Sequence, residues 1–404
     1  MTAQRNLVDE RGDASLVAAV AESVSSPRSA DSNSFILHAP LELAARYGLL
    51  PFVRTDRRFE ARDRIADVAR QWEAHSPAVR APRVTNATAA DPAGAMVAAL
   101  AAGDVDAADA AAVALSESVT PEALVSEVGD AILPCTTAAA HAAIFLYLLP
   151  RVAPRGELPV SLLRPLAREL ARFPDWRLRW IDDFQASPVA GTQLFDALAA
   201  TPFVGMGASP FIHPMLMQVD PTGIAREALA HGVPVDDLAG AQRSVLRAAA
   251  LSMLLEPDEH APYGWSHCLT MSQAALGIAA RLRDPARAIA IAATYVVGFR
   301  ATLASAPLQR DYAPVDPGCA WGESFEAGSQ TAAAAVWHAP VWERASIVEV
   351  LATRAAVHAD AHLVKYTLAC LDAASLDPMA SPLYLAACAH LHGVWATRAQ
   401  PWSD

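Results

Sequence analysis

Helical periodicity runs through most of this 404-residue chain and constrains its fold more than any other feature. Apolar residues recur every three or four positions in stretches rich in alanine, leucine and arginine, which all favour helix. Such stretches cover residues 41–50, 59–75, 93–102, 238–255 and 271–304. Proline and glycine recur between them and mark turns, whereas the apolar–polar alternation of strands is scarce. The sequence therefore predicts an all-α fold, a large single-domain multi-helix bundle with its site buried between helices.

Two segments bear on the domain boundaries. The serine-rich stretch "SVSSPRSADSNS" covers residues 23–34. It predicts a flexible N-terminal arm over residues 1–33 before a helical domain at 34–404. Residues 131–150 carry no formal charge and are long enough to cross a membrane. They also hold Pro134, two threonines and His141, and charged helices surround them, so we expect a buried core helix.

Composition excludes several classes of protein and partner. Hydrophobic residues make up 53% of the chain and charged residues 18%, with a net charge of −12. The chain is therefore not a disordered one, and neither nucleic acid nor an anionic membrane is an expected partner. Five widely spaced cysteines without a CxxC pair fit a reducing compartment. No signal peptide is recognisable at the start, so we expect a cytoplasmic protein.

Three nucleotide-binding and hydrolase motifs are missing from the sequence. It contains no GxGxxG, no GxxxxGK[ST] and no GxSxG. Nothing therefore supports a dinucleotide site, a P-loop or a serine-hydrolase elbow, and we expect no bound flavin.

Four of the twelve histidines lie in apolar helical segments: His38, His141, His267 and His362. One such histidine alone is best explained as a core residue bonded to a backbone carbonyl. Four together favour a shared metal ion, because each buried imidazole needs a polar partner and neutral imidazole is a common ligand. Among the other histidines, His75 and His260 are expected at the surface, and His213, near two prolines, in a loop.

Lys365 is the only lysine, whereas the chain has 30 arginines. On a helix, Lys365 and His362 lie about 60° apart, and His358 is expected on the same face. A lone lysine can be an accident of an arginine-rich composition. Alternatively, the site needs an amine that can lose its proton, which arginine cannot do. A neutral amine can form a Schiff base, or add carbon dioxide to become an anionic carbamate.

Asp360, His362 and Lys365 resemble the C-terminal Asp-x-His-x-x-Lys pattern of questin oxidase-like proteins. The segments "FILHAPLELAARYGL", "TTAAAHAAIFLYLLP" and "YGWSHCLTMSQAAL" are similar to the three other histidine segments of that family, in the same order. The first segment here keeps a single histidine, and the second lacks the usual Gly-Tyr after His141. The resemblance covers about residues 33–375.

This resemblance implies an all-helical, mononuclear non-heme iron oxygenase. It would use dioxygen to oxidise an aromatic or polyketide-like substrate, by C–C cleavage or Baeyer–Villiger-type oxygen insertion. Its implied Fe(II) ligands are the four histidines and a carboxylated lysine, here His38, His141, His267, His362 and Lys365. Imidazole and oxygen ligands without thiolate suit Fe(II). Tyr263 and Trp265 are candidates either to line a pocket for a flat substrate or for plain core packing.

Other functions stay open at this point. The HxH pair His390 and His392 occurs with a carboxylated lysine in amidohydrolases, but here it follows the lysine inside a helical pattern, which argues against that class. Lys365 could instead form a Schiff base in a metal-free, aldol-type enzyme. The chain could also be a non-catalytic helical protein that binds an apolar ligand. The sequence does not identify the substrate. It also leaves open whether the chain forms a homodimer and whether His358 or His213 belongs to the site.

Overall fold

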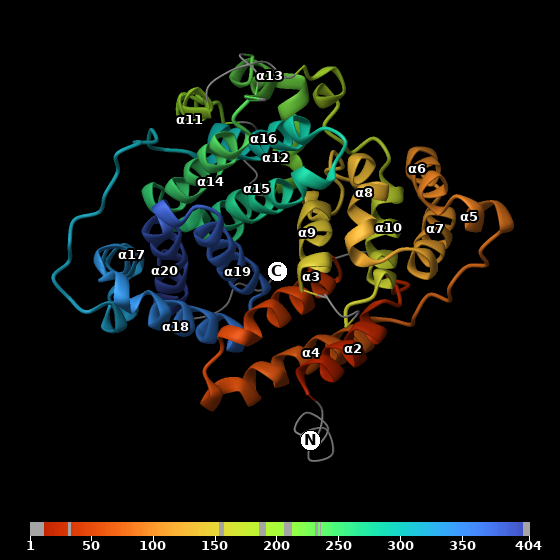
Figure 1. Ribbon diagram of the computed structural model, residues 1–404, viewed down its shortest axis with the longest axis horizontal. Coiled ribbons are helices and arrows are strands. Elements are labelled where there is room, and N and C mark those ends of the chain that lie inside the picture. The colour runs from red at the N-terminus through yellow and green to blue at the C-terminus, as the bar shows by residue number, and fades with distance from the viewer. Residues whose placement is uncertain are drawn as a thin grey trace. The chain divides into compact units, whose positions relative to one another are not determined.

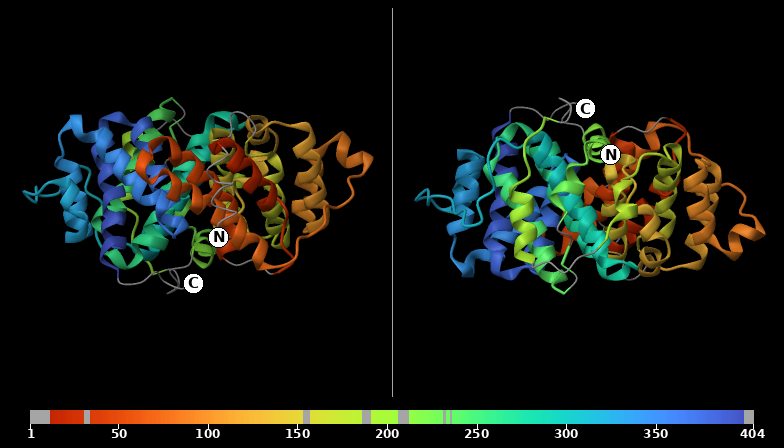
Figure 2. Two further views of the ribbon diagram at one scale, coloured as in Figure 1. Left: turned by 90° about the horizontal axis from the view of Figure 1, so that it is seen from below. Right: turned by 90° about the horizontal axis from the view of Figure 1, so that it is seen from above.

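The computed structural model describes residues 12–30, 34–152, 157–185, 191–205, 212–230, 233–234 and 236–398. Over these residues the chain forms helices and connecting turns and no strand (Figure 1). The two further views in Figure 2 show coiled ribbons and no arrows. Two isolated bridges occur, Arg28 with Ala78 and Cys135 with Arg177. The predicted all-α fold class is confirmed.

The helices belong to two compact units, residues 1–177 with 281–283 and residues 178–280 with 284–404. A boundary near residue 177 was not expected from the sequence. The first unit contains α2 (Asp13–Val24), α3 (Ser34–Leu49), α4 (Arg58–His75), α5 (Asn86–Ala90), α6 (Pro92–Ala102), α7 (Val105–Ser118), α8 (Pro121–Ile132), α9 (Ala142–Val152) and α10 (Leu163–Arg172). The second contains α11 (Gly191–Ala199), α12 (Ile212–Thr222), α13 (Ile224–Ala228), α14 (Leu238–Leu255), α15 (Ser266–Ile278), α16 (Pro285–Leu303), α17 (Ser329–His338), α18 (Arg344–Val357), α19 (Ala361–Leu376) and α20 (Ser381–Thr397).

Short turns of 3-10 helix lie between these helices. They are η1 (Leu50–Phe52), η2 (Thr55–Arg57), η3 (Ala138–Ala140), η4 (Val160–Leu162), η5 (Trp180–Asp183), η6 (Asp258–His260), η8 (Ala279–Arg281), η9 (Trp321–Glu323), η10 (Phe325–Ala327), η11 (Val341–Glu343) and η12 (Pro378–Ala380). One π-helical turn, η7 (Ala261–Trp265), leads directly into α15.

Aspartate side chains define the starts of several helices. Asp104 accepts a hydrogen bond from the third backbone amide of α7, and Asp237 and Asp284 do the same for α14 and α16. Each satisfies an amide that has no partner within its own helix. Proline at the first position of α6, α8 and α16 costs no hydrogen bond there.

In the first unit α3 packs against α9, α4 and α2, while α6, α7 and α10 contact one another. In the second unit α15 lies between α16 and α19, and α20 contacts α14, α17 and α19. Among the described residues, α16 is the one helix long and apolar enough to cross a membrane, and 89% of its apolar window is buried within the protein. A core helix has the same properties.

The expected flexible arm at residues 1–33 is wrong for its central part. Residues Asp13–Val24 form α2 with buried positions at Leu16, Val17, Val20 and Val24, and this face packs on α4. Asp13 anchors the helix through ion pairs with Arg58 and Arg62. The serine-rich composition concealed the helical spacing of these four apolar side chains. Residues 1–11 and 31–33 lie outside the described part of the chain.

The expected core helix over residues 131–150 is also only partly right. These residues are mostly buried, but α8 ends at Ile132 and α9 begins at Ala142. The chain turns between them, where Pro134 cannot donate an amide hydrogen to a continuing helix. His141 therefore precedes α9 and does not lie in the middle of a helix.

Candidate functional site

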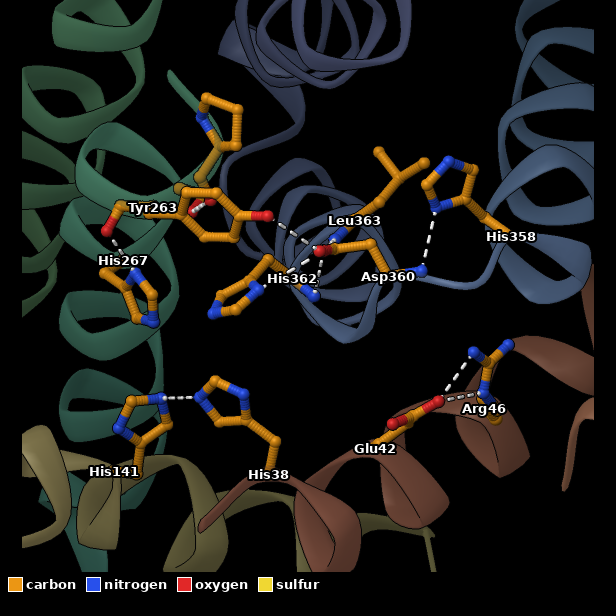
Figure 3. A network of polar contacts seen from close by, with 12 residues as sticks. His38, Glu42, Arg46, His141, Tyr263, His267, His358, Asp360, His362 and Leu363 are labelled. Carbon is orange, nitrogen blue, oxygen red and sulfur yellow. Dashed lines mark hydrogen bonds and ion pairs between the residues drawn. The ribbon is translucent and has the colours of Figure 1, made fainter. Parts of the chain in front are cut away.

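Two buried histidines face each other in the first unit. His38 lies in the first half of α3 and is 8% exposed, whereas His141 precedes α9 and is 2% exposed. Their Nε2 atoms are 3.0 Å apart (Figure 3), and their ring centroids are 4.8 Å apart. Two nitrogens bound at right angles to one metal ion at about 2.1 Å would be about 3.0 Å apart. The spacing therefore fits two adjacent ligands.

The other ring nitrogen of His141 identifies its tautomer. Nδ1 of His141 lies 2.7 Å from the carbonyl oxygen of Ala138 and 3.1 Å from that of Ala139. A carbonyl only accepts, so Nδ1 carries the hydrogen and Nε2 keeps its lone pair. Metal-binding histidines usually donate their second ring N–H in this way.

The carbonyls that orient His141 come from an unusual backbone turn. Ala138, Ala139 and Ala140 all have positive φ, at 53°, 49° and 56°. Alanine visits this left-handed region at a cost of about 1 kcal/mol or more per residue, and strain of this kind concentrates at functional sites. A hydrogen bond from the Thr136 amide to the Trp176 carbonyl, 2.8 Å long, anchors the start of the turn.

A buried ion pair continues the His38 face of α3. Glu42 and Arg46 follow at intervals of four residues, and Arg46 donates to the Glu42 carboxylate at 2.6 and 2.8 Å. Both are buried, with Glu42 8% and Arg46 1% exposed. Removing one partner from such a pair costs roughly 3–5 kcal/mol. This pair was not predicted from the sequence, although Glu42 follows His38 by four residues, a spacing that places both side chains on one helix face.

His267 lies in the second unit, at the second position of α15. The preceding π-turn η7 brings the Tyr263 carbonyl to 2.7 Å from Nδ1 of His267. Nδ1 therefore donates, and Nε2 carries the lone pair of the ring. The ring is 3% exposed. Single π-turns occur often at functional sites, and here the turn orients an imidazole.

His362 is held by the carboxylate of Asp360. Asp360 caps α19 by accepting hydrogen bonds from the amides of His362 and Leu363, at 2.7 and 3.2 Å. The same oxygen lies 3.2 Å from Nδ1 of His362. Burial raises the pKa of this carboxyl, but the His362 ring and the two amides outweigh burial and bring the pKa to about 2. Asp360 is therefore a carboxylate that keeps the hydrogen of His362 on Nδ1.

Tyr263 connects the two histidines of the second unit. Its hydroxyl lies 3.2 Å from the second oxygen of Asp360, its carbonyl accepts from His267, and its ring stands edge-on to His362 at 4.7 Å (Figure 3). The structure thus gives Tyr263 a positioning role that the sequence did not reveal. Trp265, the other proposed pocket residue, is fully buried with its ring 6.5 Å from that of Phe299.

Lys365 lies one turn after His362 on α19, as predicted, and is 3% exposed. The prediction that His358 shares this face is wrong. His358 is the C-cap of α18, which ends at Val357, and α19 begins only at Ala361. Its Nδ1 accepts a hydrogen bond from the Asp360 amide at 3.0 Å. The Asp360 cap separates the two helices, a break that helical spacing alone does not show.

His213, His390 and His392 belong to other helices. His213 belongs to α12 and not to a loop, and its side chain lies outside the described part of the structure. His390 and His392 are buried in α20, as the helical pattern predicted. Nε2 of His390 lies 2.9 Å from Asp258, and Nε2 of His392 lies 3.0 Å from the Thr367 hydroxyl.

No protein-family model, curated protein or solved structure matches this chain. Any inference about the function of the site therefore rests on its own residues. Each of three buried imidazoles could serve as a metal ligand, those of His38 and His141 in the first unit and that of His267 in the second.

Proposed function

We propose that the chain is a mononuclear non-heme iron oxygenase that acts on an aromatic or polyketide-like substrate. Its metal ligands would be His38, His141, His267, His362 and a carboxylated Lys365. The observation that carries the proposal is the hydrogen bonding of Nδ1 in three of the four histidines. His141 and His267 donate to backbone carbonyls and His362 to Asp360, so the lone pair of each ring is on Nε2.

The donor set supports iron among the common metals. Imidazole nitrogens with one anionic oxygen ligand suit Fe(II), and thiolate is absent from the proposed set. Bound Fe(II) would supply the redox chemistry that activates dioxygen. The resemblance to questin oxidase-like proteins, with its segments in order, supports the same metal and the same class of substrate.

Lys365 would contribute as a carbamate. Its neutral amine attacks carbon dioxide, a C–N bond forms, and one proton leaves, which gives an anionic oxygen ligand. Burial at 3% exposure favours the neutral amine over the ammonium. Arginine could not undergo this reaction, because it keeps its proton.

Asp360 and Tyr263 would act through His362 and His267. The Asp360 carboxylate holds the hydrogen on Nδ1 of His362, and the Tyr263 hydroxyl holds Asp360 in place. Neither needs to touch a substrate. Removal of such partners of metal ligands typically costs about 10–100-fold in metal affinity.

The deciding experiment measures iron by elemental analysis after anaerobic loading with Fe(II) and removal of the excess. We expect about one iron per chain, and its loss in both His141→Gln and His267→Gln. Loss in both variants would support one ion that needs both histidines. His392→Gln, in a buried histidine bound to Thr367, is the matched control and should keep its iron. Failure of the wild-type chain to retain any transition metal would refute the proposal and favour a metal-free lysine enzyme or a binding protein.

Oxygen consumption tests the reaction class. Iron-loaded protein should consume dioxygen only in the presence of an accepted substrate, for which a panel of hydroxyanthraquinones is a suitable start. The absorption spectrum should show no flavin. Full turnover under strict anaerobiosis, or a flavin spectrum in the purified protein, would contradict an iron oxygenase.

A further inference from the structure

A cavity of about 570 Å³ opens in the second unit, between the N-terminal half of α14 and the start of α20. Ligand-binding pockets are commonly about 300–1,000 Å³, so the cavity can hold a molecule of two or three rings. None of its lining residues is among the proposed iron ligands. The function proposed above does not use it.

Three arginines line this cavity, Arg243, Arg247 and Arg310. Two already have carboxylate partners. Arg247 makes a two-pronged pair with Asp377 at 2.7 and 2.9 Å, and Arg310 lies 2.6 Å from Asp196.

Arg243 differs from its two neighbours. It stands one turn before Arg247 on α14 and makes no ion pair or hydrogen bond with any residue that the structure describes. One further carboxylate, Asp237, lines the cavity, and it accepts a hydrogen bond from the Gly240 amide at 2.8 Å. The cavity therefore offers one guanidinium for a single anionic group, because the other two arginines are neutralised. A guanidinium binds a carboxylate through two parallel hydrogen bonds.

Aromatic rings form other parts of the wall. Tyr312 and Trp337 stand edge to face, with ring centroids 6.1 Å apart and an interplanar angle of 82°. The Arg310 guanidinium lies over the Phe195 ring at 4.6 Å, which is a favourable cation–π contact. Flat rings pack favourably against such walls.

We propose that this cavity is a second binding site, which takes a small aromatic carboxylate. The carboxylate binds Arg243, and the ring packs against Trp337 and Tyr312. The site is independent of the proposed iron centre and stands whether or not the chain is an oxygenase.

Titration calorimetry with 2-naphthoate tests the proposal. We expect saturable binding to the wild-type chain at one site. Arg243→Gln should weaken binding about tenfold, since a hydrogen-bonded charge contributes about 1.5–3 kcal/mol. Arg83→Gln is the matched control, because Arg83 is exposed, lies in the first unit and lines no part of this cavity. It should bind as the wild type does.

Two analogues and a second variant separate the contributions. The neutral 2-naphthamide should bind about tenfold more weakly than 2-naphthoate and lose nothing further in Arg243→Gln. Cyclohexanecarboxylate should bind more weakly than 2-naphthoate and be insensitive to Trp337→Leu. The variant His267→Gln should bind 2-naphthoate with unchanged affinity, which separates this site from the iron centre. No binding of 2-naphthoate at millimolar concentration, or equal binding by Arg243→Gln, would overturn the proposal.

Discussion

The hydroxyl of Tyr263 lies 3.2 Å from a carboxylate oxygen of Asp360, and Asp360 in turn lies 3.2 Å from Nδ1 of His362. The same tyrosine accepts a hydrogen bond from His267 through its carbonyl. One residue between α14 and α15 therefore orients imidazoles on both α15 and α19. Such an arrangement is expected where two histidines must present their Nε2 atoms in a defined direction.

Tyr263→Phe removes only the hydroxyl and leaves the carbonyl that orients His267. We expect a loss of about 1 kcal/mol in the free energy of unfolding and a fall of about tenfold in iron affinity. A competition assay against a coloured chelator measures the affinity, and urea unfolding measures the stability. Tyr312→Phe, in a half-buried tyrosine away from the histidines, should leave iron affinity unchanged. An unaltered affinity in Tyr263→Phe would show that the hydroxyl positions nothing.

Asp360→Asn tests the carboxylate separately from the helix cap. Asparagine caps helices about as well as aspartate, so the start of α19 should survive. The neutral amide holds the Nδ1 hydrogen of His362 less strongly, and iron affinity should fall about 10–100-fold. The matched control is Asp284→Asn at the start of α16, where the aspartate also caps a helix but contacts none of the four histidines. Equal iron affinity in both variants would contradict the role given to Asp360.

The left-handed turn before His141 leads to a prediction about the free energy of unfolding. Glycine adopts positive φ without the steric cost that alanine bears. Ala139→Gly should therefore leave the free energy of unfolding unchanged or raise it by up to about 1 kcal/mol. Ala98→Gly, at an exposed position within α6, should lower it by about 1 kcal/mol. Urea unfolding of both variants checks the difference in sign, and an equal loss in both would show that residue 139 is not in the left-handed region.

Part of the fold and of the candidate site was predictable from the sequence, and part of it was not. Helical periodicity predicted the fold class and the positions of His267, His362 and Lys365, because spacing along a helix is a local property. It did not predict the turn at Ala138–Ala140, because no glycine or asparagine marks the positive φ values. The aspartate that holds His362 was visible as part of a motif, but its contact with Tyr263 joins residues 97 positions apart. Such a contact depends on how η7 and α19 pack, which periodicity does not specify.

The ion pairs of α2 predict a dependence of stability on pH. Burial raises the pKa of Asp13, but hydrogen bonds and charge from Arg58 and Arg62 outweigh burial, so the pKa of this carboxyl is lowered in the folded chain. The unfolded chain then binds the proton more readily, and the stabilisation is present above the unfolded pKa and disappears as pH falls through the folded pKa. The wild type should have a higher free energy of unfolding than Asp13→Asn at pH 7. This difference in free energy should disappear in acid. A difference that is constant from pH 7 to pH 3 would contradict the pairing.

Lys365 offers the most direct test of the proposed metal site, because it is the only lysine in the chain. Protein prepared with iron and ¹³C-labelled bicarbonate, and then exchanged for a diamagnetic metal such as zinc, should give one carbamate carbon resonance. The absence of other lysines assigns that resonance to Lys365, once the terminal amine has been excluded by its lability after dilution of bicarbonate.

Lys365→Arg conserves the positive charge but cannot form the carbamate, because arginine stays protonated. This variant should lack the resonance and retain no iron. Lys365→Ala should also lose iron, and acetate or propionate should restore part of the binding by supplying the missing carboxylate oxygen. Wild-type iron content in Lys365→Arg would rule the carbamate out, and so would a wild-type spectrum without the resonance.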